Sequence, residues 1–497
     1  MSLINVSSLT FAYEGSYENI FDNVSFQIDT GWKLGFCGRN GRGKTTFLRL
    51  LTGEYTYGGS ISASVKFEYF PFVVADPERS AKEILVNLAP DSLLWEIQRE
   101  LYILGLGDYI LYRPFSTLSN GEQTKLLLAG LFLHENSFLL IDEPTNHLDM
   151  DARKTIAEYL NKKSGFILVS HDRSFLDGCV DHILSINKAD IEVTKGNFSA
   201  WQLQKDRKDA FELAENERLN KEIARLKQSV RQTSRWSDKV ESSKNKPLKS
   251  GLSADKGYIG HQSAKMMKRS KAIEKRRLDA VGEKSGLLKN LETAGSLKIH
   301  PLVYHSPRLI SFENVSVSYD GRRIFGGMSF TLERGERAAL TGSNGSGKSS
   351  ILKLICGEDI PHSGTVYTAS RLIISYVPQD ASFLSGSLDA CARDCQIDET
   401  LFKAILRKLD FSREQFEKDM SDYSAGQKKK TLIARSLCER AHVYIWDEPL
   451  NYVDALSRIQ IEELIKTFKP TLLFVEHDRA FCENTATKII DMTKRGD

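Results

Sequence analysis

Long apolar runs are absent from this sequence of 497 residues. No segment approaches the roughly 18–20 consecutive apolar residues that a membrane-spanning helix needs. The first fifteen residues also lack the basic start and apolar centre of a secretory signal. The seven cysteines are scattered, and the one close pair, Cys391 and Cys395, has no second pair to complete a metal-binding set. We therefore expect a cytoplasmic protein with free thiols, acting away from the membrane.

A large excess of one charge is also absent overall, because 68 Lys and Arg residues stand against 65 Asp and Glu, a net charge of +3. This balance hides a basic middle. Residues 201–300 hold 24 basic and 13 acidic residues, so the rest of the chain is net acidic. The stretch AKMMKRSKAIEKRR at 264–277 has seven basic residues against one acid. Such asymmetry indicates a surface for nucleic acid.

The chain repeats itself. Four short motifs of the first half recur in the second, in the same order and 304–306 residues further on. Four features in one order at nearly one offset indicate a tandem duplication. The pairs are GRNGRGKT (38–45) with GSNGSGKS (342–349), LSNGEQ (118–123) with YSAGQK (423–428), FLLIDEP (138–144) with VYIWDEP (443–449), and HDRSF (171–175) with HDRAF (477–481).

Each copy has the pattern of an α/β domain. Short apolar runs such as Leu34–Cys37, Phe138–Ile141 and Phe166–Val169 are separated by helical patterns, as expected of buried parallel strands. We therefore predict two tandem α/β domains, at residues 1–198 and 307–497, joined by a linker at residues 199–306.

The motif GRNGRGKT fits G-x-x-x-x-G-K-[ST], the phosphate-binding loop (P-loop). Its glycines let backbone N–H groups turn toward phosphate oxygens, and the following helix adds positive potential. Lys44 is expected to reach the β- and γ-phosphates, and the Thr45 hydroxyl to ligate Mg²⁺. Lys348 and Ser349 take these places in the second copy. Each loop follows a predicted strand and begins an apolar-periodic helix, which makes each half a nucleotide-binding domain.

Each copy also has an Asp-Glu pair at the end of an apolar strand. The aspartate is expected near the metal, and the glutamate after it can orient or deprotonate the attacking water. A histidine after a further apolar strand is predicted to contact the γ-phosphate. These residues are Asp142, Glu143 and His171 in the first copy, and Asp447, Glu448 and His477 in the second.

The position of LSNGEQ, between the P-loop and the DEP strand, resembles the signature motif of the ATP-binding-cassette (ABC) superfamily, over residues of about 3–194 and 308–493. The resemblance implies a monomer whose two cassettes close head to tail, each ATP lying between one P-loop and the other cassette's signature. Tyr13 and Tyr319 match the family's adenine-stacking aromatic. The ATP-contacting residues so implied are Tyr13, Gly38, Asn40, Gly41, Gly43, Lys44, Thr45, Thr46, Ser119 and Gly121, with Tyr319, Gly342, Asn344, Gly345, Gly347, Lys348, Ser349, Ser350, Ser424 and Gly426.

Two departures from the family pattern separate the copies. Gln379, in YVPQD, matches a family glutamine that binds the metal, but the first copy has Phe72 at that place. The second copy also reads DEPLNYVD where the first reads DEPTNHLD. We expect both sites to hydrolyse ATP, at rates or with Mg²⁺ handling that differ. The implied metal ligands are Thr45, Asp142, Ser349, Gln379 and Asp447.

The middle of the chain reads as helix. From Trp201 to Lys246 there is neither Gly nor Pro, and apolar residues fall at heptad spacing there and in a return stretch, which predicts an antiparallel helical hairpin. Pro247 and Gly251 belong to its turn region. Residues 221–277 hold 17 basic and five acidic residues, a repulsive surplus that phosphates would neutralise. The hairpin is therefore predicted to lie along RNA, whose backbone shape a long helical pair can follow.

With this hairpin between two cassettes, the chain resembles the ABC-F family of ribosome-associated ATPases. The phrases AFELAENE (210–217), MKRSKAI (267–273) and YIWDEPLNYVD (444–454) resemble its Lsa-type branch, which protects bacterial ribosomes against lincosamides, pleuromutilins and group A streptogramins. The resemblance implies ATP and Mg²⁺ as cofactors, and the exit site of the 70S ribosome, 23S rRNA and peptidyl-site tRNA as partners, with no DNA. The candidate RNA-contacting residues are Lys244, Lys246, Lys249, Leu252, Ser253, Lys256, Lys265, Lys268, Arg269 and Lys271.

Three other functions compete with ribosome protection. Housekeeping ABC-F translation factors tend to carry a longer insertion than the roughly 40 residues found here between Asp76 and Phe115. The twin-cassette ATPase of a sugar importer has a short link in place of a basic hairpin. DNA-repair ATPases of this superfamily carry cysteine sets that are missing here.

Overall fold

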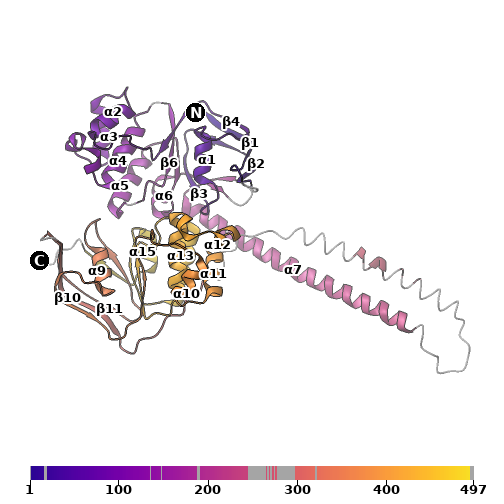
Figure 1. Ribbon diagram of the computed structural model, residues 1–497. Helices are drawn as coiled ribbons and strands as arrows, with labels where there is room; N and C mark the ends of the chain where they lie inside the picture. The colour runs from indigo at the N-terminus through magenta and orange to yellow at the C-terminus, as the bar shows by residue number, and fades with distance from the viewer. Residues whose placement is uncertain are drawn as a thin grey trace, which may run out of the picture. The chain divides into compact units, whose positions relative to one another are not determined.

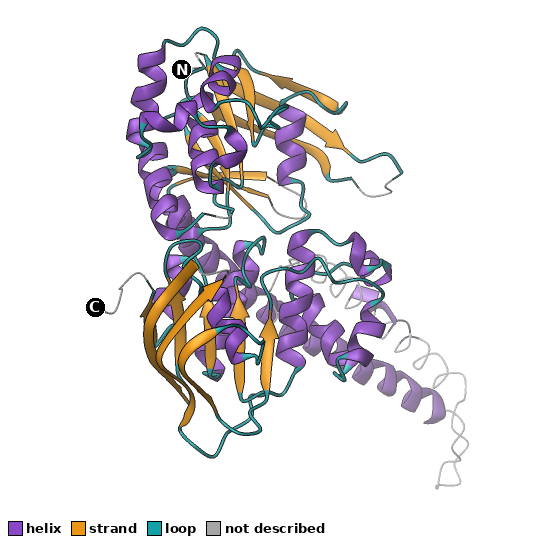
Figure 2. Cartoon of the chain, turned by 60° about the vertical axis from the view of Figure 1, so that its left-hand side comes forward, coloured by secondary structure: helices purple, strands orange, loops and turns teal. Residues whose placement is uncertain are grey.

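The computed structural model describes residues 2–15, 19–134, 136–146, 148–186, 191–243, 297–319 and 322–492, together with Lys265, Lys268, 271–273, Lys275 and Arg276. Within residues 191–243, side chains are described only as far as residue 228. By contacts the chain divides into two units, Met1–Trp201 with Ala294–Asp497, and Gln202–Thr293. The first unit holds both copies of the duplicated domain. In both copies strands and helices pack against one another (Figure 2).

Two sheets build the first half. The three-stranded antiparallel sheet has the order β2-β1-β4, and the six-stranded sheet has the order β5-β6-β7-β3-β8-β9, in which only β9 is antiparallel to its neighbour. The runs predicted to be buried parallel strands are confirmed as β3, β6 and β7. The bounds are β1 Leu3–Phe11, β2 Phe21–Asp29, β3 Lys33–Cys37, β4 Gly58–Ser62, β5 Lys66–Phe70, β6 Ser137–Asp142, β7 Phe166–Val169, β8 His182–Ile186 and β9 Ile191–Lys195.

Figure 1 labels the helices of the first half, of which α1 begins at Lys44 of the P-loop and α4 directly after Ser119. Their bounds are α1 Lys44–Leu51, α2 Ala81–Leu88, α3 Leu94–Ile103, α4 Asn120–Leu131, α5 Met150–Asn161 and α6 Arg173–Cys179, with short 3-10 turns η1 Asp108–Tyr112 and η2 Phe115–Thr117.

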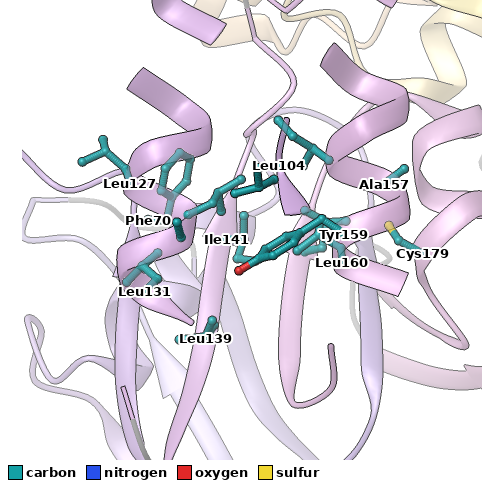
Figure 3. Close-up of a cluster of buried hydrophobic side chains, with 14 of the residues drawn as sticks. Phe70, Leu104, Leu127, Leu131, Leu139, Ile141, Ala157, Tyr159, Leu160 and Cys179 are labelled. Carbon is teal, nitrogen blue, oxygen red and sulfur yellow. The ribbon is translucent and has the colours of Figure 1, made fainter. Parts of the chain in front are cut away.

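A core cluster beneath β6 fixes the strand that ends in the Asp-Glu pair. Figure 3 shows Leu139 and Ile141 of β6 among side chains from other elements, including Tyr159 of α5. The hydroxyl of Tyr159 donates a hydrogen bond of 2.7 Å to the buried carboxylate of Glu100, which also accepts one from Lys163. The buried carboxylate is thus paired, and the side chains that pack against β6 are apolar, as a stable core requires.

The second half repeats the plan. Its antiparallel sheet has the order β11-β10-β13, and its parallel sheet the order β14-β15-β16-β12-β17. The bounds are β10 Arg308–Tyr319, β11 Arg322–Glu333, β12 Arg337–Thr341, β13 His362–Thr368, β14 Ile374–Val377, β15 Val443–Asp447, β16 Leu472–Val475 and β17 Lys488–Asp491, with α9 Lys348–Ile355, α10 Leu388–Asp394, α11 Glu399–Lys408, α12 Arg413–Glu417, η3 Met420–Asp422, α13 Ala425–Cys438, α14 Ala455–Phe468 and α15 Arg479–Thr485. The predicted α/β class and tandem architecture are confirmed.

Helix α7 (Phe198–Ser243) leaves the first half without a break. Phe198 and Trp201 at its start are buried in the core of the first half. The residues predicted to turn the hairpin lie outside the described residues, as does most of the return stretch. At the other end, Leu297 and Ile299 are buried in the core of the second half. The domain boundaries themselves stay predictions.

None of the helices in the described part of the chain is both long and apolar enough to cross a membrane.

Candidate ATP sites

Each P-loop forms a tight turn in front of a helix. Gly43 and Gly347 have φ values of +89° and +91°, and a Cβ at either would overlap a neighbouring side chain, Ile20 in the first half and Phe325 in the second. Only glycine fits both demands. The amino end of the following helix, α1 or α9, is therefore left open for an anion.

The P-loop lysines are buried and bonded to their own loops. Lys44 Nζ donates to the carbonyl oxygens of Gly38 (2.8 Å) and Arg39 (3.1 Å), and Lys348 Nζ makes the equivalent bonds to Gly342 and Ser343, both 2.9 Å. Burial lowers the pKa of both lysines. A buried cation whose hydrogen bonds go to carbonyl oxygens of its own loop is well suited to exchange them for phosphate oxygens.

The hydroxyl after each lysine contacts the aspartate predicted to lie near the metal. Thr45 Oγ1 donates to Asp142 Oδ2 over 2.7 Å, and Ser349 donates to Asp447. Asp447 Oδ1 is buried and has no hydrogen-bond partner among the described residues. An unpaired buried carboxylate oxygen beside a hydroxyl is a donor set that suits Mg²⁺.

The two glutamates have the same backbone and different surroundings. Glu143 and Glu448 have φ values of +50° and +47°, a conformation that non-glycine residues seldom adopt outside functional sites. Each faces its histidine: Glu143 Oε1 lies 3.3 Å from His171 Nε2, and Glu448 Oε1 lies 3.6 Å from His477 Nε2. The strained turn thus points each carboxylate at the predicted γ-phosphate contact.

The two glutamates differ in pKa, and His477 contributes more to this difference than the amide of Gln379 does. Burial raises the pKa of Glu143 to about 8, helped by Asp142. Burial also opposes ionisation of Glu448, but the His477 ring, whose Nε2 lies 3.6 Å from Oε1, and after it the amide of Gln379 lower its pKa to about 2. Phe72, at the place of Gln379, packs against the apolar core and has no donor to offer. The departure noted in the sequence therefore has an electrostatic consequence.

The signature serines begin helices. Ser119 is the N-cap of α4 and Ser424 the N-cap of α13, and each forms a capping box with the side chain three residues on, Glu122 or Gln427. A cap of this kind fixes the first turn and points its N–H groups outward. Gly426 follows at a close approach, since a Cβ there would lie 2.5 Å from the carbonyl oxygen of Tyr452.

Two cavities combine residues of both halves. The first site, a cavity of about 470 Å³, contains Lys44 and Glu143 of the first half and Ser424 and Gly426 of the second. Its predicted residues are Tyr13, Asn40, Gly41, Gly43, Lys44, Thr45, Thr46, Asp142, Glu143, His171, Ser424 and Gly426.

The second site, a cavity of about 420 Å³, combines the P-loop of the second half with residues of the first half. Its predicted residues are Tyr319, Asn344, Gly345, Gly347, Lys348, Ser349, Ser350, Gln379, Glu448 and His477. From the first half it takes Asn120 and Arg153. Ser119 and Gly121 flank Asn120 but are not among the described residues that line this cavity.

The two tyrosines predicted to stack on adenine lie at the mouths of these cavities. Tyr13 is 43% exposed and bonds through its hydroxyl to Thr46, and Tyr319 is 41% exposed and bonds to Ser350. Each side chain is thus partly accessible from solvent, as stacking on a base requires.

The sequence reasoning missed several lining residues. Tyr452 lines the first site, and its carbonyl oxygen accepts a 2.7 Å hydrogen bond from Asn40 of the other half. Arg153 and Asn451 line the second site. The unusual sequence DEPLNYVD drew attention to the segment that holds Tyr452, but it did not indicate Asn40 as the partner of Tyr452.

Glu476 was also missed. It stands before His477 where the first half has Ser170, and it is 3% exposed. Its two carboxylate oxygens accept hydrogen bonds from the backbone N–H of Leu450 (2.7 Å) and His477 (3.2 Å). It therefore ties the segment after Glu448 to the segment that carries the histidine. Burial raises its pKa to about 7.

Glu476→Gln is expected to make stability less sensitive to pH. Between pH 4.5 and 7 the folded wild type binds more protons at this residue than the unfolded chain, so its stability falls as pH rises. A shift of this size is worth about 3 kcal/mol. The melting temperature of the variant relative to wild type should therefore increase by several degrees from pH 5 to pH 8 in a thermal scan. A constant difference would contradict the burial of a titrating carboxylate.

The sequence profile of the ABC transporter family matches residues 21–146 and 325–451, just over half of the chain. The chain belongs to the ATP-binding-cassette family. Each matched segment begins in the second strand of its half, β2 or β11, and runs past the corresponding Asp-Glu pair, so it covers the P-loop and the signature. The chain is accordingly an ATPase, as the sequence predicted.

Relatives along the whole chain place this ATPase in the ABC-F branch, which confirms the resemblance. The chain is 28% identical over its full length, and 87% of the other protein, to the "Ribosome protection protein VmlR" of Bacillus subtilis (strain 168). It is 25% identical, over 99% of the chain and 77% of the relative, to "ABC transporter F family member 2" of Arabidopsis thaliana.

Among solved structures, an archaeal ribosome recycling factor, aABCE1, in complex with the ribosomal stalk protein aP1 matches 97% of the chain and 87% of its own length with a TM-score of 0.63. At 17% identity this similarity concerns the fold alone.

Proposed function

We propose that this ABC-F ATPase binds the bacterial ribosome at its exit site when ATP closes the two cassettes, and that its linker displaces antibiotics from the peptidyl-transferase region. The ATPase part is supported by the two cavities, each combining the P-loop of one half with the signature region of the other. The ribosomal part is supported by full-length similarity to a protein named for ribosome protection and by the basic linker.

The proposed hydrolysis uses the chain's own groups at each site. The lysine and the open helix terminus bind the phosphates, and the signature helix of the other half adds a second amino end. The glutamate receives a proton from the water that attacks the γ-phosphorus, and the bond from phosphorus to the β–γ bridging oxygen breaks. Bound Mg²⁺ would offset phosphate charge, held by Thr45 and Asp142 in the first site and by Ser349, Gln379 and Asp447 in the second.

The linker carries the proposed contact with rRNA and peptidyl-site tRNA. Lys265, Lys268 and Lys271 are described, helical and exposed, as a contact with phosphates requires. The other candidates, Lys244, Lys246, Lys249, Leu252, Ser253, Lys256 and Arg269, lie outside the described residues. In this proposal the hairpin shifts the tRNA and the drug leaves, after which hydrolysis opens the cassettes and releases the protein.

A variant with Glu143→Gln and Glu448→Gln tests ribosome binding, because it should bind ATP without hydrolysing it. We expect it to sediment with purified bacterial 70S ribosomes through a sucrose cushion when ATP is present, and less as salt is raised. The matched controls are the same variant without ATP and the wild type with ADP. Protein that binds ATP but stays at the top of the cushion would refute the ribosomal proposal.

A housekeeping translation factor of the same branch is the second candidate. It is favoured by relatives of similar identity whose names carry no resistance role, such as "Probable ATP-binding protein YbiT" of Escherichia coli O157:H7, at 27% identity. Cell-free translation separates the two. Ribosome protection predicts that the wild type restores synthesis in the presence of a lincosamide or pleuromutilin, whereas a housekeeping factor leaves the inhibition unchanged.

A further inference from the structure

The P-loops of the two sites differ in charge. The first P-loop is the more basic, and its two arginines contact the second half. The first loop reads GRNGRGK and the second GSNGSGK, so Arg39 and Arg42 stand where the second loop has Ser343 and Ser346. Arg39 Nη1 lies 3.7 Å, and Arg42 Nη2 3.5 Å, from Asp410 Oδ1 of the second half. The boundary of the first site thus has two cations around one carboxylate.

Asp410 adopts a backbone conformation that favours glycine. It follows helix α11 with a φ of +69°, and its counterpart after helix α3 is Gly105, with a φ of +72°. Aspartate tolerates this region at some cost, whereas glycine has none. Because Asp410 occupies a position where glycine would be unstrained, and because it contacts two arginines there, its carboxylate is the feature that this position provides.

A second ion pair joins the halves beside the histidine of the first site. Arg173 Nη2 lies 2.5 Å from Glu462 Oε2, and both side chains are buried, at 10% and 8% exposed. The counterparts in the other half do not reproduce it. Arg479 pairs with Glu483 of its own helix, and Ala157 stands where the second half has Glu462.

We propose that Arg39, Arg42 and Asp410, aided by Arg173 and Glu462, are positioning residues that hold the second half's signature against the first half's P-loop, so that the first site releases ATP more slowly than the second. The second site cannot form these pairs, because serine, glycine and alanine occupy the equivalent places. This inference rests on the proposal that each ATP lies between the two halves. The two sites then exchange nucleotide at different rates because the charges at their boundaries differ, independently of any difference between their catalytic groups.

The Asp410 pairs are partly exposed, so each contributes modestly and the effect depends on salt. Asp410 is 26% and Arg42 27% exposed, while Arg39 is 7% exposed. Together such pairs amount to roughly a tenfold difference in release rate at low ionic strength, decreasing as salt screens them.

The release of labelled ATP tests the inference without ribosomes. The full chain with Glu143→Gln and Glu448→Gln is loaded with radiolabelled ATP and Mg²⁺, chased with unlabelled ATP, and sampled on filters. Two phases of equal amplitude are expected. Asp410→Asn, and separately Arg39→Ser with Arg42→Ser, should bring the slow phase to within about threefold of the fast one. The matched control is Asp359→Asn, an exposed aspartate of the same half.

Introducing the same charges at the second site tests the inference further, because a merely structural role of these residues in the first site would leave the release rate of the second site unchanged. Ser343→Arg, Ser346→Arg and Gly105→Asp together should slow the fast phase roughly tenfold. One release rate in the parent, or two phases that Asp410→Asn leaves unchanged in a chain with wild-type melting temperature, would overturn the inference. Either result leaves ribosome sedimentation untouched, whereas fewer than two bound ATP per chain would refute the paired sites themselves.

Discussion

Replacing Glu143 and Glu448 together by glutamine is expected to lower the rate of ATP hydrolysis by about 10³-fold, because a general base contributes roughly 10²–10⁴-fold and glutamine cannot accept the proton. ATP affinity should change little, since the lysines, hydroxyls and helix ends that bind phosphate are unaltered. Phosphate release at saturating ATP measures the first quantity and equilibrium binding of labelled ATP the second. Hydrolysis above about a tenth of the wild-type rate would contradict the assignment of these glutamates.

The single variants should be unequal. The Glu448 carboxylate is held ionised by His477 and Gln379, whereas Glu143 has Phe72 in place of the amide donor. Glu448→Gln is therefore expected to remove most of the turnover and Glu143→Gln a smaller part. Equal losses would indicate that the different surroundings of the two carboxylates have no effect on turnover.

Replacing Arg458 by methionine is expected to destabilise the second half by about 3–5 kcal/mol, the cost of leaving a buried charge without its partner. Arg458 is 6% exposed and its guanidinium donates to Asp478 Oδ2 and to the carbonyl oxygens of Val453 and Leu450. Asp478 Oδ2 and the carbonyl oxygen of Val453 would lose these donors in a buried environment, whereas the carbonyl oxygen of Leu450 would keep a bond from the backbone N–H of Val453. The midpoint of urea unfolding, followed by the fluorescence of the buried Trp446, measures the effect.

The matched control is Arg413→Met. Arg413 is 96% exposed and pairs at 4.0 Å with Glu417, so its loss should change stability by less than about 0.5 kcal/mol. A comparable effect of the two substitutions would show that the Arg458 network does not stabilise the fold. Because Arg458 also holds the backbone after Glu448, its loss is expected to reduce hydrolysis at the second site.

The grouping of the P-loop, the Asp-Glu pair and the histidine within each half was predictable from the sequence, because each of them ends or follows a strand of the same parallel sheet. The P-loops, the Asp-Glu pairs and the histidines all lie at or just beyond the carboxyl ends of strands that pair in parallel, so they meet at one edge of the sheet. Helix α7 was likewise predictable, since a run without Gly or Pro and with heptad spacing has few alternatives.

Partners across the two halves were not predictable. The arginines of GRNGRGK are visible in the sequence, but nothing in it links them to Asp410, which is more than 360 residues away. The same holds for Asn40 and the Tyr452 carbonyl, a contact made by a backbone oxygen and therefore independent of side-chain identity. The effect of Glu476 depends on its burial, which spacing alone does not give.

The crossing of partners between the halves has a consequence for how such a chain can diverge. The P-loop of the first half lies beside the signature, Tyr452 and Asp410 of the second, so in the proposed arrangement each half carries part of the other's nucleotide site. A substitution in one half therefore alters the site formed with the P-loop of the other half, and a compensating substitution would have to arise in that other half. Exchange of a whole half between related genes would separate residues that had adapted to each other. The two halves are thus expected to be inherited as a matched pair, although each has a core of its own.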